Sequence, residues 1–208
     1  MESNIEVFSQ SSIKIKKSKI VYFDPFKIDT EYHDADYIFI THNHYDHYDV
    51  ESIRKVIKDN SMIIVPKSIY DEVFSSFSNY TIYPVEPLNS YDIGIRFDTI
   101  RAYNNSKQFH PKDNNWLGYI IYLDNLSYYV MGDTDDTVDA REVKCDVLFI
   151  PIGGTYTMNK EEAIFYTNFI KPKVVIPIHY GSIVGNMSDG EYFISHLDND
   201  IKSYLLIK

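Results

Sequence analysis

The chain has 208 residues, 44% of them hydrophobic and 24% charged, a composition typical of a globular protein rather than a disordered one. Its formal net charge of −10 argues against a protein whose main task is to hold nucleic acid. No apolar run approaches the ~20 residues that span a bilayer, no signal peptide is evident, and a single cysteine, Cys145, excludes an intramolecular disulfide. We therefore expect a soluble cytoplasmic protein that folds as one domain over residues 1–208.

The first half of the chain is predicted to be rich in strands. Apolar or alternating runs predict strands at residues 12–16, 19–24, 36–41, 62–65, 82–85, 93–97 and 99–103. Helices are predicted at residues 50–58, where Asp49 is a natural N-cap, and at residues 69–77. Residues 104–115 form a long polar loop, and loops of this length are commonly functional. Whether this loop moves as a lid is left open.

In the second half, strands and helices alternate. Residues 116–123 and 127–131 predict a hairpin, and residues 145–150, 174–178 and 204–207 predict further strands. A helix is predicted at residues 160–171, with Asn159 and Glu162 in a capping-box arrangement, and a shorter one at residues 189–197. Early strands followed by this alternation favour two packed sheets with helices outside.

The sharpest motif is the segment THNHYDH, which places His42, His44, Asp46 and His47 within six residues. Side chains two residues apart in an extended backbone point to the same side, so His42 and His44 can bind one metal ion. Asp46 and His47 follow and can bind a second ion nearby. Imidazole and carboxylate ligands suit Zn²⁺, Mn²⁺ or Fe²⁺. The alternative is a solvated histidine-rich loop without a metal.

Three further polar residues lie at strand ends or in the long loop. Asp133 follows one predicted strand, His179 follows another, and His110 lies in the polar loop. Taken alone, Asp133 is more typical of a turn aspartate, His179 of a buried core histidine and His110 of a surface histidine. Together they supply three more ligands in places that commonly carry site residues.

In this order, these residues resemble the five motifs of the metallo-β-lactamase-fold superfamily of metal-dependent hydrolases. Asp24 in VYFDP matches the first motif, the THNHYDH segment the second, and His110, Asp133 and His179 the third to fifth. The stretches AYNNSKQFHPKDNNWLGY, GDTDD and PIGGTYTMNKEEA are similar to a compact branch that includes ascorbate-6-phosphate lactonase. The resemblance implies an α/β (α+β) fold, the four-layer αββα sandwich.

The resemblance also implies a ligand set for two divalent metal ions per chain, with Zn²⁺ expected first and Mn²⁺ or Fe²⁺ as alternatives. The implied ligands are His42, His44 and His110 for one ion, Asp46, His47 and His179 for the other, and Asp133 as the bridge. Asp24 would lie behind the ligands and orient their loop. Cys145 has no ligand-like context and is interpreted as a core residue, so antibiotic hydrolysis is not expected.

The implied activity is hydrolysis of a small ester, lactone or phosphoester by a metal-bridging hydroxide. Asp46 would orient this nucleophile and later hold a proton, which makes it the candidate catalytic residue. Tyr45, Tyr156 and Tyr180 are near the motifs and are candidate substrate contacts, although most of 19 tyrosines must serve packing. The alternatives are a phosphodiesterase or nuclease of the same fold and a metal-binding scaffold without activity. We expect a small-molecule substrate and no membrane partner; a homo-oligomer stays open.

Overall fold

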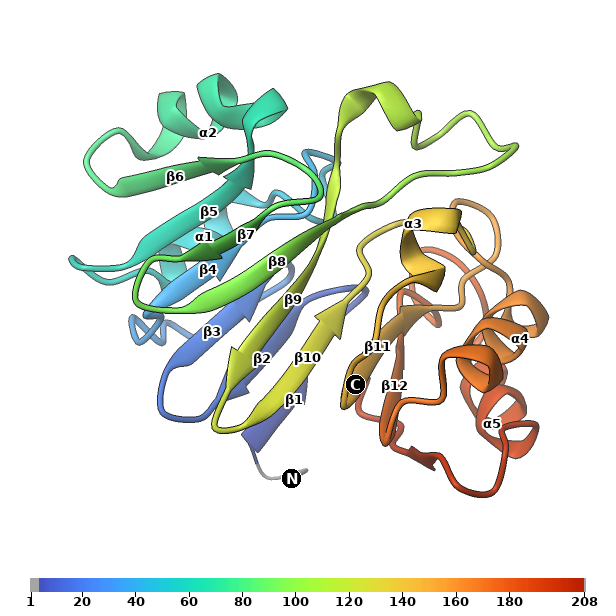
Figure 1. Cartoon of the computed structure of the whole chain (residues 1–208). Helices are drawn as coiled ribbons and strands as arrows, with labels where there is room; N and C mark the ends of the chain where they lie inside the picture. Colours follow the sequence, from blue (N-terminus) through green and yellow to red (C-terminus); the bar gives the residue numbers. More distant parts are fainter. Residues whose placement is uncertain (1–3, 208) are drawn as a thin grey trace.

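The computed structural model describes residues 4–207, which form two β-sheets packed face to face (Figure 1). The first sheet has the spatial order β1 (Ile5–Val7), β2 (Ile13–Lys16), β3 (Ile20–Phe23), β4 (Tyr37–Phe39), β5 (Met62–Pro66) and β6 (Thr81–Val85). The second has the order β13 (Lys202–Ser203), β12 (Val174–Ile178), β11 (Val147–Pro151), β10 (Leu126–Val130), β9 (Leu117–Leu123), β8 (Arg96–Arg101) and β7 (Ser90–Asp92).

Helices cover the outer face of each sheet. Helices α1 (Val50–Val56) and α2 (Tyr70–Phe77) pack on the first sheet, and α3 (Val138–Arg141), α4 (Lys160–Ile170) and α5 (Met187–Ser195) pack on the second (Figure 1). The elements also include 3-10 turns at Lys67–Ile69 and Lys112–Asn114. The predicted mixed α/β fold with four layers is confirmed. Within residues 4–207, no helix combines the length and the hydrophobicity needed to cross a membrane.

Alternation along the strands produces these layers. In β4, Phe39 points into the cluster between the sheets, while Ile38 packs with α1 and α2 on the other side. In β11, Phe149 belongs to the cluster between the sheets and Leu148 to the one beneath the second set of helices. The strands are apolar on both faces because both faces are covered.

The two sheets interlock where β4 ends. The backbone N–H of Leu117, at the start of β9, donates to the carbonyl of Thr41 at 3.1 Å. The buried hydroxyl of Tyr119 donates to the carbonyl of Ile40 at 2.8 Å. The segment after β4 is thus fixed against the second sheet by directed bonds as well as by packing.

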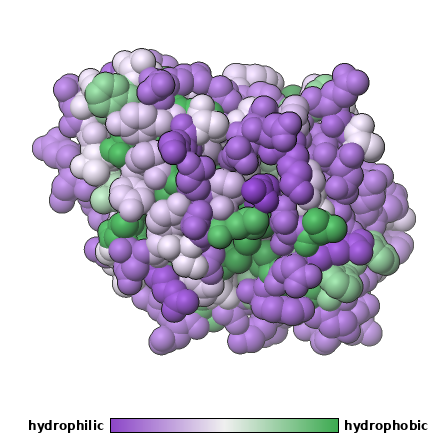
Figure 2. Space-filling view, turned by 45° about the horizontal axis from the view of Figure 1, so that its top comes forward, coloured by the Kyte–Doolittle hydropathy of each residue, from purple (hydrophilic) through white to green (hydrophobic). Residues whose placement is uncertain are grey.

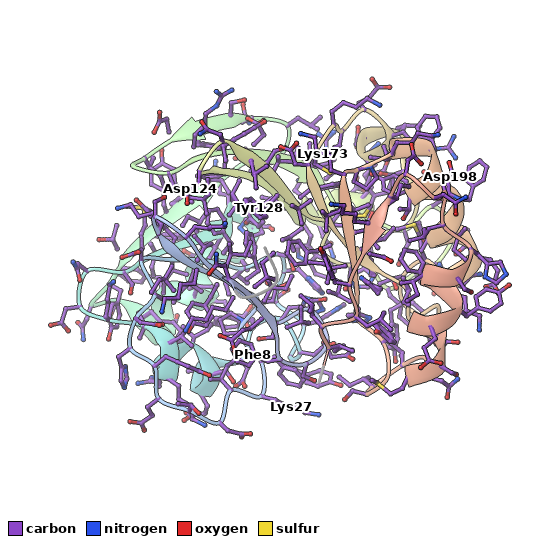
Figure 3. All side chains as sticks on the ribbon, turned by 90° about the horizontal axis from the view of Figure 1, so that it is seen from below. Phe8, Lys27, Asp124, Tyr128, Lys173 and Asp198 are labelled. Atoms are coloured by element: carbon purple, nitrogen blue, oxygen red, sulfur yellow. The ribbon has the colours of Figure 1, made fainter. Side chains whose placement is uncertain are left out.

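A second link lies at the other end of β9, in the β9–β10 turn, where Asp124 is labelled in Figure 3. The backbone N–H of Ser18, in the turn between β2 and β3, donates to the Asp124 carboxylate at 3.2 Å. A strand of this length extends about 20 Å, so the sheets are held together at two well-separated places.

Local capping and turn chemistry places several elements as predicted. The Asn159 side chain accepts from the N–H of Glu162, whose carboxylate accepts from the N–H of Asn159, both at 2.8 Å. Asp49 caps α1 by accepting from the N–H of Glu51. The predicted hairpin is β9 and β10, which pair antiparallel across Asp124 and Asn125.

Two strand predictions are wrong. Residues 93–97 are mostly the turn between β7 and β8, where Gly94 has φ +91° and an added Cβ would lie 2.7 Å from the Tyr37 hydroxyl. The apolar residues beside this glycine pack against the core, and their alternation imitates a strand. Residues 204–207 cover the edge of the core without extended pairing; only Ile207 forms an isolated bridge, to Val7. The short elements β1, β7, α3 and β13 are missing from the prediction, and α5 begins two residues earlier than expected.

One part of the outer face of the second sheet is not covered by a long helix. A shallow hollow beside α3 is lined by side chains of β8 and β9, among them Ile100, Ile120 and Tyr122. Figure 2 shows hydrophobic side chains near the middle of a mainly hydrophilic face, with others toward its edges. Apolar surface of this modest extent is common on soluble domains.

The Cys145 thiol is expected to react very slowly with thiol reagents in the folded protein. It packs against the cluster that holds α4, and burial raises its pKa to about 12. Because the thiolate is the reactive form, only ~10⁻⁴ of the thiol is reactive at pH 8. Reaction with Ellman's reagent should be slow at pH 8, faster as the pH rises, and rapid after unfolding in urea. Rapid reaction of the folded protein at pH 8 would contradict this prediction.

Candidate metal centre

The loop after β4 brings the first group of predicted ligands together. The Nε2 atom of His42 and the Nδ1 atom of His44 are 3.0 Å apart. His110, from the loop that arches over the top of the molecule in Figure 1, completes a group whose ligand atoms lie within 4.8 Å of one another. The Trp116 ring packs on all three imidazoles, with centroids at 4.8, 4.9 and 5.6 Å. Trp116 therefore supports the geometry of this group.

A second group lies beside the first. Asp46, His47 and His179 also place their ligand atoms within 4.8 Å of one another. His179 follows β12 and has φ +57°, a left-handed turn that is uncommon for histidine. Its Nε2 atom lies 3.4 Å from Asp46 Oδ2. Strained backbone of this kind is frequent at functional sites.

Asp133 lies between the two groups. One of its oxygens is 3.4 Å from His110 Nε2 and 3.1 Å from His179 Nε2. The other oxygen is 3.3 Å from His47 Nε2. Asp133 follows β10, and its side chain is 3% exposed. A single carboxylate thus faces imidazoles of both groups, the position that a bridging ligand requires.

Asp24 fixes the orientation of His47 from behind. Its carboxylate accepts from Nδ1 of His47 at 2.7 Å, from the N–H of Thr41 at 2.8 Å and from the hydroxyl of Thr41 at 2.6 Å. Since a carboxylate only accepts, His47 carries its proton on Nδ1 and leaves Nε2 for the centre. The Thr41 oxygen is 3.0 Å from Nδ1 of His42, which fixes that ring in the same way.

Asn104 fixes the orientation of His110 in the same way as Asp24 fixes that of His47. The sequence motifs did not predict this role of Asn104. Its side-chain oxygen lies 3.0 Å from Nδ1 of His110 and accepts from the N–H of that residue at 3.1 Å. Its amide nitrogen donates to Asp135 at 3.1 Å and to the carbonyl of Tyr156 at 2.9 Å, which fixes the orientation of the amide. The available signal was its place six residues before His110, but asparagine is ordinary in a loop.

Several of the buried atoms that face the centre have no hydrogen-bond partner. Within residues 4–207, these atoms include Nε2 of His47, His110 and His179 and Oδ1 of Asp133. Buried polar atoms are almost always paired, so an unpaired cluster indicates that another group satisfies them. Imidazole and carboxylate donors in two adjacent groups fit divalent cations such as Zn²⁺, Mn²⁺ or Fe²⁺.

The charges in the centre are strongly coupled. Burial alone raises the pKa of Asp133, but His179 and His47 outweigh burial and hold that pKa well below its usual range. Burial lowers the pKa of His179, yet Asp133 outweighs it and raises the pKa to about 9. Burial also lowers the pKa of His42 well below its usual value. Protons and cations compete for these nitrogens, so cations displace protons on binding.

A cavity of about 320 Å³ opens beside the centre and contacts His44, Asp46 and Asp133. Tyr45 and Tyr156, two of the three predicted substrate contacts, belong to its lining. Tyr180 does not: it is 1% exposed and packs in the cluster beneath α4 and α5. The turn at His179 directs the side chain of His179 to the centre and that of Tyr180 into the core. Tyr180 is therefore not retained as a substrate contact.

The family is shown by comparison with known proteins. Residues 4–179 match a family model described as a β-lactamase superfamily domain. The chain therefore belongs to the β-lactamase superfamily, as its motifs predict.

Individual relatives point to one group within it. A UPF0173 protein of Pyrococcus abyssi is 30% identical over 158 residues, covering 75% of this chain and 71% of the relative. A UPF0173 metal-dependent hydrolase of Lysinibacillus sphaericus is 26% identical over 215 residues, covering 94% and 92%. The crystal structure of a protein from Parabacteroides distasonis, described as a metal-dependent hydrolase, has a TM-score of 0.84 at 25% identity and covers 98% and 93%. The enzyme class that the sequence predicts, a metal-dependent hydrolase, is confirmed.

Replacing Asp24 by Ala is expected to weaken metal binding by roughly 10- to 100-fold, the usual effect of removing a partner behind a ligand. The change leaves the N–H and hydroxyl of Thr41 and Nδ1 of His47 without their acceptor in a fully buried place. Each buried group that loses its partner costs about 1–3 kcal/mol of folding free energy. Zn²⁺ titration and urea unfolding measure both effects.

The matched control is Asp59→Ala, which removes an exposed carboxylate from a surface turn. It should leave metal affinity and stability unchanged. Wild-type Zn²⁺ affinity in Asp24→Ala would show that Asp24 does not orient His47.

Proposed function

We propose that the chain holds two divalent cations at the seam between its sheets and hydrolyses a small ester, lactone or phosphoester. The supporting observation is the pair of ligand groups that share Asp133, with unpaired buried nitrogens facing the carboxylate. Zn²⁺ is the expected cation, with Mn²⁺ or Fe²⁺ as alternatives. Bound there, two such ions supply an activated water near neutral pH and polarise the oxygen under attack.

The side chains of the chain itself have distinct roles in this proposal. His42, His44 and His110 would hold one cation and Asp46, His47 and His179 the other, with Asp133, which faces imidazoles of both groups, as their shared ligand. Asp24 and Asn104 keep His47 and His110 in the tautomer that presents Nε2. These hydrogen bonds remove the need to reorganise the ligands during the reaction.

Asp46 is the proposed catalytic residue. Its carboxylate faces His179 and His47 on one side, at 3.4 and 3.7 Å, and lines the open cavity on the other. It is therefore placed to orient an attacking water and to hold the proton that the water loses. Tyr45 and Tyr156, which line the same cavity, are proposed substrate contacts.

The open cavity favours an enzyme over a scaffold. Catalytic metal sites keep a position open for water or substrate, whereas structural sites are closed by protein ligands. Here His44, Asp46 and Asp133 all contribute to the wall of a cavity that a small molecule can enter.

Metal analysis followed by a substrate panel tests the proposal. About two divalent ions per chain, in protein made without chelator, are expected by elemental analysis. The loaded protein should hydrolyse at least one of 4-nitrophenyl butyrate, γ-butyrolactone and bis(4-nitrophenyl) phosphate. A folded protein that refuses metal on reconstitution would overturn the proposal. Binding of metal without any turnover would favour the scaffold, and a salt-sensitive preference for the phosphodiester would favour the phosphodiesterase or nuclease.

A further inference from the structure

Apart from the candidate ligands, the cavity beside the centre is lined by uncharged, mainly hydrophobic side chains, two of which are tyrosines with a hydroxyl group. Its lining consists of His44, Asp46, Asp133, Tyr45, Phe109, Tyr156 and Ile183. The last four are aromatic or aliphatic. A volume of about 320 Å³ suits a small organic molecule, near the lower end of ordinary ligand sites.

Two of the aromatic side chains form a wall. Phe109 and Tyr156 meet edge to face, with ring centroids 4.7 Å apart at 89°. Phe109 is nevertheless 45% exposed, and Tyr45 is 66% exposed. Covering exposed aromatic surface with an apolar ligand removes it from water, which makes the free energy of ligand binding more favourable.

The residues of this wall are fixed by the same backbone segment and the same side-chain amide as the candidate ligand His110. Phe109 directly precedes His110, and the carbonyl of Tyr156 accepts from the Asn104 amide that also bonds His110. Substrate contact and metal ligand are thus fixed relative to each other, which reactive positioning requires.

The lysine side chains near the centre make their contacts outside the cavity lining. Lys107 donates to Asp135 at 2.7 Å and to the carbonyl of Thr157 at 2.8 Å. Lys112 lies 3.3 Å from the Tyr103 hydroxyl and 3.9 Å from Asp139. Lys27 contacts Ser182, next to the lining residue Ile183, at 3.5 Å. Among residues 4–207, no Lys or Arg belongs to the cavity lining.

An ionised group on the distal part of a substrate would therefore meet uncharged side chains and no Lys or Arg in this lining. Burial of an unpaired charge is costly, and phosphate or carboxylate recognition ordinarily uses Arg or Lys. An uncharged apolar group meets no such cost and covers the aromatic wall.

We propose that the substrate is an uncharged carboxylic ester or lactone with an apolar alkyl or aromatic group, and that Phe109 and Tyr156 select that group. This rests on the hydrolase proposed above and narrows its substrate class. In the reaction, the oxygen of water bonds to the acyl carbon and the acyl–oxygen bond breaks. The leaving alkoxide takes up a proton from the water, giving one carboxylic acid and one alcohol.

A matched pair of esters isolates the effect of charge. In 4-nitrophenyl butyrate and 4-nitrophenyl 3-sulfopropanoate, the reacting ester is the same and only the end of the acyl chain differs, methyl or sulfonate; the sulfonate carries the charge without attacking the ester itself. The rate measured with the Asp133→Ala variant is subtracted from the rate measured with Zn²⁺-loaded protein, which removes the contribution of non-specific hydrolysis. We expect kcat/KM to be at least about tenfold higher for the butyrate, the usual size of a pocket preference. 4-Nitrophenyl phosphate and its bis ester should be poorer still.

Variants of the wall separate recognition from structure. Phe109→Ala should raise KM for the butyrate several-fold with a smaller change in kcat and with metal content unchanged. Phe109→Leu keeps an apolar side chain, so its KM should be close to that of the wild type. This variant replaces the alanine variant in the test if Phe109→Ala disturbs His110. Phe165→Ala, on the exposed face of α4, is the control and should change neither constant.

The outcomes distinguish the two proposals. Equal or better turnover of the sulfopropanoate or of a phosphoester would overturn the proposal of an apolar ester and leave the hydrolase proposal standing. An unchanged KM in both Phe109 variants would remove this residue from substrate recognition. If metal-loaded protein cleaves neither these esters nor γ-butyrolactone, the hydrolase proposal fails and the narrower one fails with it.

Discussion

The Asp46→Asn variant is expected to lose about a thousandfold in kcat, within the range that a positioned acid–base group contributes. The amide has nearly the same shape as the carboxylate but neither the charge to orient a water nor the basicity to hold a proton. Asp46 makes its contacts with His47 and His179 and lines the cavity, and no helix cap or strand depends on it. The variant should therefore keep its melting temperature. Steady-state kinetics at saturating substrate, with metal content measured on the same sample, tests this prediction.

Asp59→Asn is the control because it makes the same chemical change at an exposed turn. It should retain full activity. A rate for Asp46→Asn within a few-fold of wild type, with both metals bound, would exclude Asp46 as the catalytic residue.

The Asp133→Ala variant is expected to bind less than one divalent ion per chain and to have no measurable activity. Asp133 faces nitrogens of both ligand groups at 3.1–3.4 Å, so its removal takes a ligand from each. It also leaves His47 and His179 without the carboxylate that raises the pKa of both against the effect of burial. Elemental analysis after gel filtration, and the visible spectrum of the Co²⁺-substituted protein, measure the loss.

Asp136→Ala provides a control from the same GDTDD segment. Asp136 pairs with Arg141 outside the centre, so its removal should leave metal content and kcat unchanged. Two ions per chain in Asp133→Ala would show that this residue does not bridge the two groups.

The features that could be predicted from the sequence are those with a local cause. The capping box of Asn159 and Glu162 fixes the start of α4 within four residues of chain. The THNHYDH segment is unusual enough to indicate a metal site on its own. The strands β5, β11 and β12 are uninterrupted apolar runs whose burial on both faces leaves little choice of position.

The features that could not be predicted depend on distant partners. Asn104 became part of the site only because the fold brings Asp135 and Tyr156 to its amide, 31 and 52 residues further on. Tyr45 and Tyr180 are alike in sequence, each next to a candidate histidine, yet one lines the cavity and the other is buried in the core. The residue type does not determine whether such a tyrosine lines the cavity or is buried in the core, because the conformation of the neighbouring backbone does. The roles of the individual ligands stay predictions until the variants are made.

The origin of the ligands in both sheets has a consequence for the synthesis of the protein. The first ligand group includes residues from the loop after β4, and the second is incomplete until His179 has been made. A growing chain that carries only the first sheet therefore offers the THNHYDH segment without the partners that would hold an ion tightly. At the proposed centre, high-affinity metal binding would follow docking of the two sheets. A cation bound there would favour the docked state through its binding free energy, so removing metal should lower the stability of the whole protein.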